Sequence, residues 1–223
     1  MLNEKMFVRI NSDCFKNANK KQIELYFDLD VAQLKIMFAM LAYANMINSI
    51  DKTKELKTKF SIELKNIRKK GSLFENIRLS KNDFAEKINS IRHPYFESIN
   101  ATENSIEYTI KKSYLMDLNT SKSGYVELND IMSYKSVNQI KMHLQLTYFG
   151  NYRIPFNFAI NFLGISKKQA RKDQIRAIKN VFKGLNIKND CEYIFPKPRE
   201  PKSNLHYNFI VKKKEQFSDD IYF

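Results

Sequence analysis

The feature that most constrains this fold is a change of hydrophobic period that occurs twice along the chain. In each half, segments with apolar residues at helical spacing are followed by two segments in which strand-forming residues alternate. This order predicts an α+β fold, mainly α, built from two copies of one architecture of about 100 residues each. The copies share an order of elements and not a set of residues.

The first half begins with three segments that the pattern indicates are helices. Residues Asp30–Ile47 have apolar side chains at helical spacing and are typical of a buried helix. A short helix is predicted at Ser61–Lys69. Ser80 precedes a third apolar-periodic segment and is expected to cap its N-terminus, while His93 and Pro94 end it.

Strand formers then cluster on both sides of a polar turn at residues 100–105, which predicts a β-hairpin. A further strand, Gly124–Leu128, is expected to pair with Ile106–Leu118. Three helices followed by a hairpin is the order of elements in a winged helix. The first half is therefore predicted to be a winged-helix domain over residues 1–130, serving dimerisation, DNA binding or both.

The second half repeats this order. Helices are predicted at Ser136–Gly150, Ile154–Leu163 and Lys167–Gly184, with Gly164 as a break and Ser166 as the cap of the third helix. Glu192–Phe195 and His206–Lys213 alternate like two strands, and the proline-rich basic segment between them is expected to form a wing. A second winged-helix domain, which binds DNA, is therefore predicted over residues 131–214, and an acidic tail is predicted at residues 215–223 after it.

The third helix of the second half is expected to carry a ridge of positive charge. At about 100° per residue five basic side chains fall on one side, and Ile178, Val181, Phe182 and Leu185 fall on the other. The five residues of this ridge are Lys168, Lys172, Arg176, Lys179 and Lys183. The formal net charge of the chain is +14, and residues 135–214 hold 17 Lys or Arg against 4 Asp or Glu. This concentration of charge predicts a polyanionic partner.

Composition narrows the function classes. Glycine occurs five times, and no glycine begins a Walker-type phosphate loop, which argues against a nucleotide-driven motor. Two distant cysteines and three isolated histidines supply neither four metal ligands nor a histidine–hydrophobe–histidine nicking motif. We therefore expect no catalytic residues, no cofactor, no metal and no enzyme activity. No transmembrane segment or signal peptide is apparent, which predicts a cytoplasmic protein without a membrane partner.

Shape favours double-stranded DNA as the polyanion. An α-helix fits the major groove of B-DNA, where Arg and Lys reach guanine edges and phosphates, whereas A-form RNA hides its major groove from a helix. The candidate DNA-binding residues of the second half are Lys167, Lys168, Arg171, Lys172, Arg176, Lys179 and Lys183 on the helix and Lys197, Arg199 and Lys202 on the wing. Those of the first half are Lys81, Asn82, Lys87 and Asn89.

The sequence resembles plasmid replication initiators of the iteron-binding Rep type, in order of elements over roughly residues 30–214 and in specific residues from about Ser136 onward. The likeness rests on SVNQIKMHLQLTYFG, IPFNFAINFLGIS and KDQIRAIKNVFKGLNI, followed by EYIF and HYNFIVKKK. The family usually has Arg where this chain has Met142 or His143, and aromatic residues where it has Gln169 and Ala170.

This resemblance implies binding to short direct repeats at a plasmid origin, opening of the adjacent AT-rich duplex, and recruitment of a host initiator and helicase. It also implies a homodimer in equilibrium with a monomer. Two alternatives remain open. One is a winged-helix transcriptional regulator of phage or plasmid origin, and the other is a protein-interaction module that binds an acidic protein, instead of DNA, through its positive charge.

Overall fold

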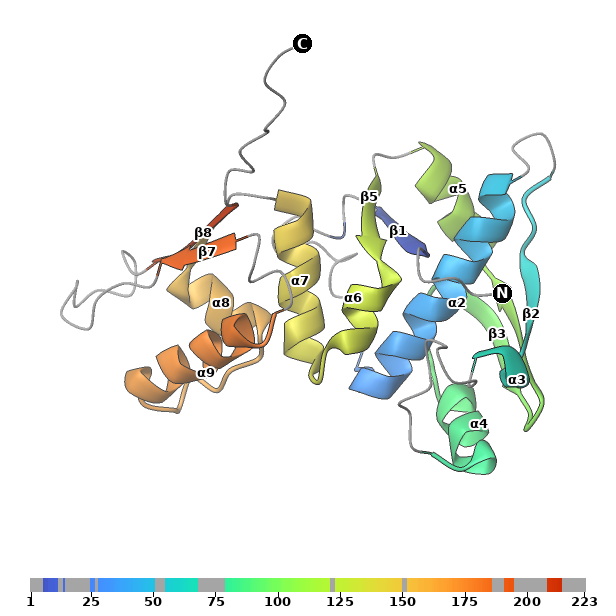
Figure 1. Cartoon of the computed structure of the whole chain (residues 1–223), viewed down its shortest axis with the longest axis horizontal. Helices are drawn as coiled ribbons and strands as arrows, with labels where there is room; N and C mark the ends of the chain where they lie inside the picture. Colours follow the sequence, from blue (N-terminus) through green and yellow to red (C-terminus); the bar gives the residue numbers. More distant parts are fainter. Residues whose placement is uncertain are drawn as a thin grey trace, which may run out of the picture. The chain divides into compact units, whose positions relative to one another are not determined.

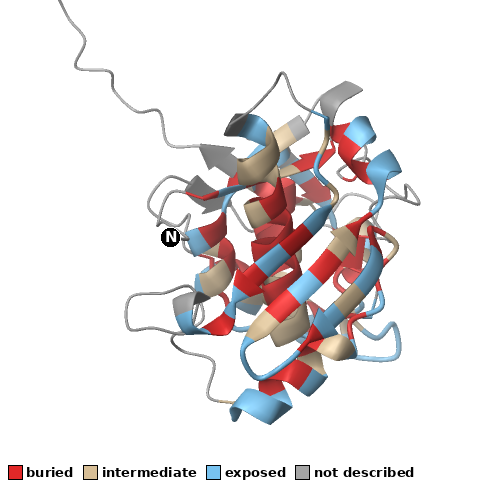
Figure 2. Cartoon of the chain, turned by 90° about the vertical axis from the view of Figure 1, so that its right-hand side faces the viewer, coloured by how far each residue is buried: buried red, intermediate tan, exposed pale blue. Residues whose placement is uncertain are grey.

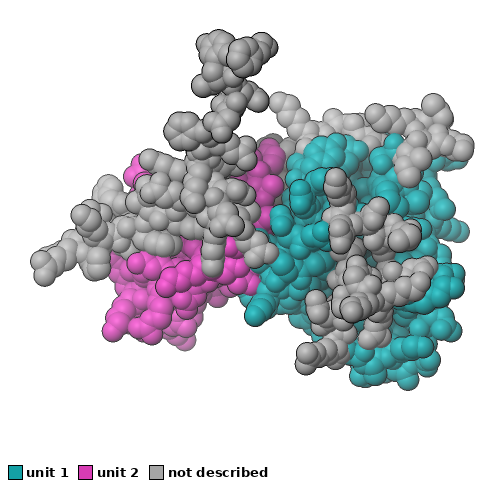
Figure 3. Space-filling view, in the orientation of Figure 1, with its two compact units in different colours: residues 1–137 teal, residues 138–223 magenta. Residues whose placement is uncertain are grey.

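The computed structural model describes residues 6–11, 14, 25–26, 28–50, 55–67, 79–120, 123–149, 152–185, 191–194 and 208–213. The chain divides into two compact units, Met1–Val137 (unit 1) and Asn138–Phe223 (unit 2), which Figure 3 colours separately. The predicted boundary between residues 130 and 131 falls inside helix α6 (Leu128–Ser133), which packs on helix α2 (Val31–Ile50) and so belongs to unit 1. The predicted acidic tail lies outside the described residues.

Helix α2 (Val31–Ile50) is the centre of unit 1 and confirms the predicted buried helix (Figure 1). Asp30 caps it, because its Oδ1 accepts hydrogen bonds from the backbone N–H groups of Ala32 and Gln33 while Gln33 Oε1 accepts from the Asp30 N–H. Lys35, which is part-buried, donates from Nζ to the Met132 carbonyl oxygen at 2.6 Å, and this bond satisfies one donor of its ammonium group. Among the helices within the described ranges, none is long and apolar enough to cross a membrane.

A three-stranded antiparallel sheet, which includes strand β2 (Lys59–Glu63), packs beside α2 in the order β2-β4-β3. Strands β3 (Phe96–Ala101) and β4 (Ser105–Ile110) form the predicted hairpin, and Tyr108 of β4 donates to the Met40 carbonyl of α2 at 2.8 Å. Buried and more exposed residues alternate along β2 and β4 (Figure 2), whereas β3 has a register shift between Phe96 and Ser98 and does not alternate. This alternation is what a half-buried sheet requires.

The predicted helix at Ser61–Lys69 is wrong over its first three residues, and its last two residues lie outside the described part of the chain. Strand β2 (Lys59–Glu63) pairs with β4 and buries Phe60 and Ile62 at alternate positions, and helix α3 (Leu64–Ile67) follows it. Buried and exposed side chains alternate along this short segment, with a period of two residues. The strand is identified only by its pairing with β4. Helix α4 (Lys81–Asn89) has the predicted cap, with Ser80 Oγ accepting from the Asp83 N–H at 3.0 Å.

The predicted pairing of Gly124–Leu128 with Ile106–Leu118 is also wrong. Strand β5 (Ser123–Glu127) pairs instead with β1 (Phe7–Asn11), near the start of the chain. Residues after β4 form helix α5 (Lys112–Thr120), because Tyr114, Leu115 and Leu118 bury one helical face.

Unit 2 begins with helix α7 (Val137–Phe149), as predicted. Strand β6 (Tyr152–Pro155) and helix α8 (Phe156–Phe162) follow, so the predicted helix at Ile154–Leu163 is wrong over its first two residues. After helix α9 (Arg171–Lys183), the predicted strands appear as β7 (Cys191–Ile194) and β8 (Asn208–Lys213). The sheet order is β6-β8-β7, all antiparallel.

A tight turn sets where α9 begins. Gly164 adopts φ +64°, and the N–H of Ile165 donates to the Ile160 carbonyl at 2.9 Å, which is a Schellman ending for α8. Ser166 Oγ accepts from the Lys168 N–H at 3.3 Å and so closes a turn rather than capping the helix. The predicted helix from Lys167 is therefore wrong over residues 167–170.

The two units share one order of elements, helix, strand, helix, helix, strand, strand: α2-β2-α3-α4-β3-β4 in unit 1 and α7-β6-α8-α9-β7-β8 in unit 2. In each, the third strand of this series lies between the other two. The architecture is α+β, and α4 and α9 occupy equivalent positions in it.

The buried side chain of His143 should make the stability of unit 2 depend on pH. It is 1% exposed on α7, and burial lowers its pKa to about 4 from an ordinary value near 6.5. The folded state then binds fewer protons than the unfolded state between these values, so stability is complete above about pH 6.5 and falls by about 3 kcal/mol as pH drops to 4. Denaturant unfolding of the wild type and of His143→Gln should show this slope in the wild type alone. Equal slopes would contradict it.

Candidate nucleic-acid interface

Helix α9 is held firmly on one side by the core of unit 2. Ile178 and Phe182 are fully buried, and the Phe182 ring lies 6.0 Å from that of Phe209 on β8. Gln174 is buried as well, and its Nε2 donates to the Ser166 carbonyl oxygen at 3.0 Å. At its C-terminus, Gly184 lies against the end of the Gln139 side chain of α7. The axis of α9 is therefore fixed.

The opposite side of α9 is exposed and polar. Successive helical residues turn by about 100°, which puts Arg176, Asn180 and Lys183 within about 60° of arc, facing away from Phe182. All three are exposed, and so is Asp173 at the edge of this arc. We call these four residues, Asp173, Arg176, Asn180 and Lys183, the outer row.

Two further lysines run beside the outer row. Lys172 and Lys179 lie about 40–60° from Arg176 on the same flank, and Lys179 is half-buried. We call them the lysine flank. The predicted ridge is thus real over four of its five residues, but it consists of a mixed outer row and a purely basic flank. Its fifth member, Lys168, is exposed in the turn before α9, as is Lys167.

Arg171 and Arg176 differ in their surroundings. Arg171 is half-buried with its guanidinium 5.7 Å from the centre of the Phe156 ring, so it packs on α8 rather than joining the outer row. Arg176 remains 63% exposed and lies 3.6 Å from the Asp173 carboxylate. A pair this exposed adds little stability but restricts where the guanidinium points. The wing candidates Lys197, Arg199 and Lys202 lie outside the described residues.

Helix α4 of unit 1 carries the other predicted DNA-binding residues, and two of them are engaged within unit 1. Lys87 forms an ion pair with Asp30 at 2.6 Å. Asn89 donates from Nδ2 to the Ala101 carbonyl at 2.9 Å and accepts at Oδ1 from the Ala101 N–H at 2.7 Å. Its amide thus completes the edge of β3 instead of facing outward. Lys81 and Asn82 are exposed.

The equivalent helices differ most in charge. Helix α4 contains two lysines, one Asp and one Glu, which cancel, whereas α9 contains five Lys or Arg against one Asp. One order of elements therefore presents a neutral helix in unit 1 and a strongly cationic helix in unit 2.

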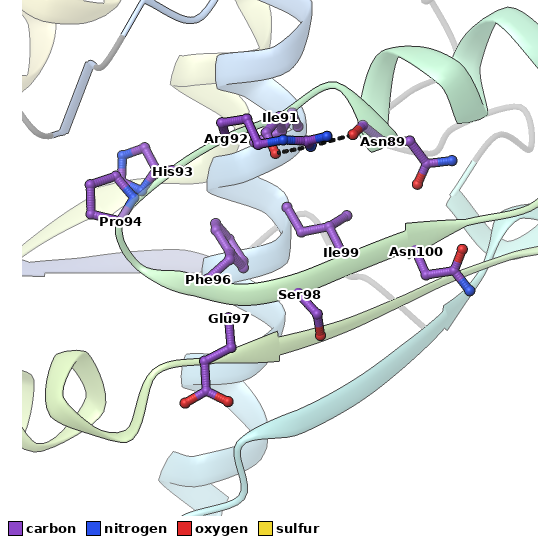
Figure 4. A pocket seen from close by; sticks show the side chains of 10 residues that line it. All are labelled: Asn89, Ile91, Arg92, His93, Pro94, Phe96, Glu97, Ser98, Ile99 and Asn100. Atoms are coloured by element: carbon purple, nitrogen blue, oxygen red, sulfur yellow. Dashed lines mark hydrogen bonds between the residues drawn. The ribbon is translucent and has the colours of Figure 1, made fainter.

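A surface hollow of about 730 Å³ lies beside β3 in unit 1 (Figure 4). Its titratable lining includes His93 and Glu97, whose side chains lie apart in this view, and Arg92, which donates to the backbone carbonyls of Asn89 and Ile91. Across the described residues no group of three or more His, Cys, Asp or Glu side chains is placed to hold a metal ion. The hollow brings together no acid–base pair, and α9 remains the stronger candidate site.

No protein-family model matches this chain, and no curated protein matches it significantly. The likeness to plasmid replication initiators consequently remains a prediction from the residues themselves. The geometry and charge of α9 carry the functional argument.

Proposed function

We propose that this chain is a double-stranded DNA-binding protein made of two winged helices, in which α9 of unit 2 is the recognition helix. The repeated order of elements and the position of the third strand between the other two support the winged-helix assignment. In helix-turn-helix folds the second helix of the motif enters the major groove, and α9 is the second helix of the motif formed by α8, the turn at Gly164 and α9.

The single observation that carries the proposal is that α9 has an exposed cationic face, while its opposite face is buried in the core of unit 2. The 13 residues of α9 span about 20 Å, and an α-helix fits the major groove, which is about 12 Å wide. The exposed aromatic side chains among the described residues, Phe7, Tyr125 and Tyr148, lie outside α9. Stacking of single-stranded bases is therefore less favoured at this helix than groove binding.

The initiator role follows from the resemblance and is part of the same proposal. Such a protein would bind direct repeats at a replication origin and use binding energy to deform the adjacent duplex, without making or breaking a covalent bond. Unit 1, with its neutral α4, would contribute protein contacts more than base recognition.

Footprinting of the full chain on the DNA that surrounds its gene tests this function. Protection of several tandem repeats supports an initiator. Protection of one palindrome at a promoter supports a transcriptional regulator instead. If no DNA segment is protected, the proposed function is wrong.

Measuring the affinity for duplex DNA at increasing salt concentration distinguishes DNA binding from the alternative in which this chain binds an acidic protein. If six or more phosphates are contacted, affinity for duplex DNA should fall by about 10³-fold or more between 50 and 200 mM salt. A weak, salt-insensitive association with duplex DNA would favour the protein-interaction alternative.

A further inference from the structure

The outer row of α9 contains two side chains that can each hold one base by two hydrogen bonds. Arginine pairs in this way with guanine O6 and N7, and asparagine pairs with adenine N6 and N7. Arg176 and Asn180 are both exposed and lie four residues apart on α9. We propose that α9 reads a guanine through Arg176 and an adenine through Asn180, while the lysine flank holds phosphates. This inference rests on the proposed DNA-binding function.

Asp173 indicates which side of α9 faces the bases. A carboxylate in the outer row would be repelled by phosphates, so a docking that put this row against the backbone is disfavoured. Toward base edges the same carboxylate is tolerated, since it can accept a hydrogen bond from cytosine N4. The lysine flank has no acidic member and suits the phosphates. The ion pair with Asp173 also limits the directions available to the Arg176 guanidinium.

The spacing on the helix limits the spacing on the DNA. Residues four apart on an α-helix are about 6 Å apart along its axis, and base pairs in B-DNA are about 3.4 Å apart. The guanine and the adenine should therefore lie within about two base pairs of each other. The target site is thus predicted to contain a short G and A element at its centre of contact.

Selection of binding sites from randomised duplex DNA by the full chain tests this inference. The wild type should select a motif with a guanine and an adenine at that spacing. Asn180→Ala should lose the preference at the adenine position, by about 10-fold, and keep the preference for guanine. Asn157→Ala, at an exposed asparagine of α8, is the matched control and should select the wild-type motif.

A base analogue gives a second readout that a folding defect would not imitate. Replacing the selected adenine with 7-deaza-adenine removes the N7 acceptor, so it should weaken wild-type binding about 10-fold and leave Asn180→Ala binding unchanged.

The outcomes separate the inference from the function on which it rests. If the wild type selects no motif at all, the proposed function fails. If it selects a motif that Asn180→Ala selects equally well, or one without an adenine near the guanine, DNA binding stands and the assignment of Asn180 is overturned.

Discussion

Replacing Arg176 and Lys179 together with alanine should weaken specific DNA binding by about 100-fold or more, while the free energy of unfolding changes by no more than about 0.5 kcal/mol. The loss combines one base contact from the outer row with one phosphate contact from the lysine flank. The fold should persist because Arg176 is exposed, Lys179 is only half-buried, and the anchors of α9 are Ile178 and Phe182. Fluorescence anisotropy on the footprinted DNA and denaturant unfolding measure the two quantities.

The comparison variant changes the equivalent helix of unit 1. Lys81→Ala with Lys87→Ala removes the same charge from α4, and we expect affinity to fall by less than about 5-fold, as the loss of a weak long-range attraction. If the α4 variant loses as much affinity as the α9 variant, base recognition is not concentrated in unit 2.

Phe182→Ala should destabilise unit 2 by about 3–5 kcal/mol. The Phe182 side chain is fully buried and packs beside Phe209, so its removal leaves a cavity where α9 meets β8. DNA binding should be lost with the fold, because the outer row depends on a fixed helix axis. Circular dichroism during denaturant unfolding and anisotropy at the same temperature check both effects.

Lys183→Ala is the control for that change, since it alters the neighbouring exposed position. It should leave the free energy of unfolding within about 0.5 kcal/mol of the wild type. A Phe182→Ala variant as stable as this control would show that α9 does not depend on the packing described.

The sequence predicted best those elements whose signal is local. The α4 cap at Ser80, the long apolar helix α2 and the β3–β4 hairpin each depend on residues within one segment, and each is confirmed. Helix α9 was found for the same reason, since its two faces differ sharply in polarity.

Elements defined by distant partners were missed. Strands β2 and β6 are four or five residues long, too short for their period to be distinguished from that of the helix that follows. Strand β5 pairs with β1 across more than 100 residues, and no local pattern specifies that register. Strands β2 and β6 nevertheless complete the two three-stranded sheets and make the two units alike.

The site was predicted in outline and corrected in detail. The pattern of positive charge predicts α9 as the site, but it also includes two residues that lie outside the outer row and the lysine flank. Lys168 lies in the turn closed by Ser166, and Arg171 packs on Phe156. A prediction based on charge does not include Asn180, because its side chain is uncharged. Asn89 is a candidate DNA-binding residue in the sequence, but in the structure its side-chain amide is hydrogen-bonded to the backbone of Ala101. This contact joins two separate segments, so the sequence alone does not show it.

The central claim is that α9 lies in the major groove of duplex DNA. Methylation interference measures this directly, because dimethyl sulfate modifies guanine at N7 in the major groove and adenine at N3 in the minor groove. We predict that the bound fraction is depleted of DNA methylated at guanine N7 within the footprint. Interference confined to adenine N3 would contradict the account.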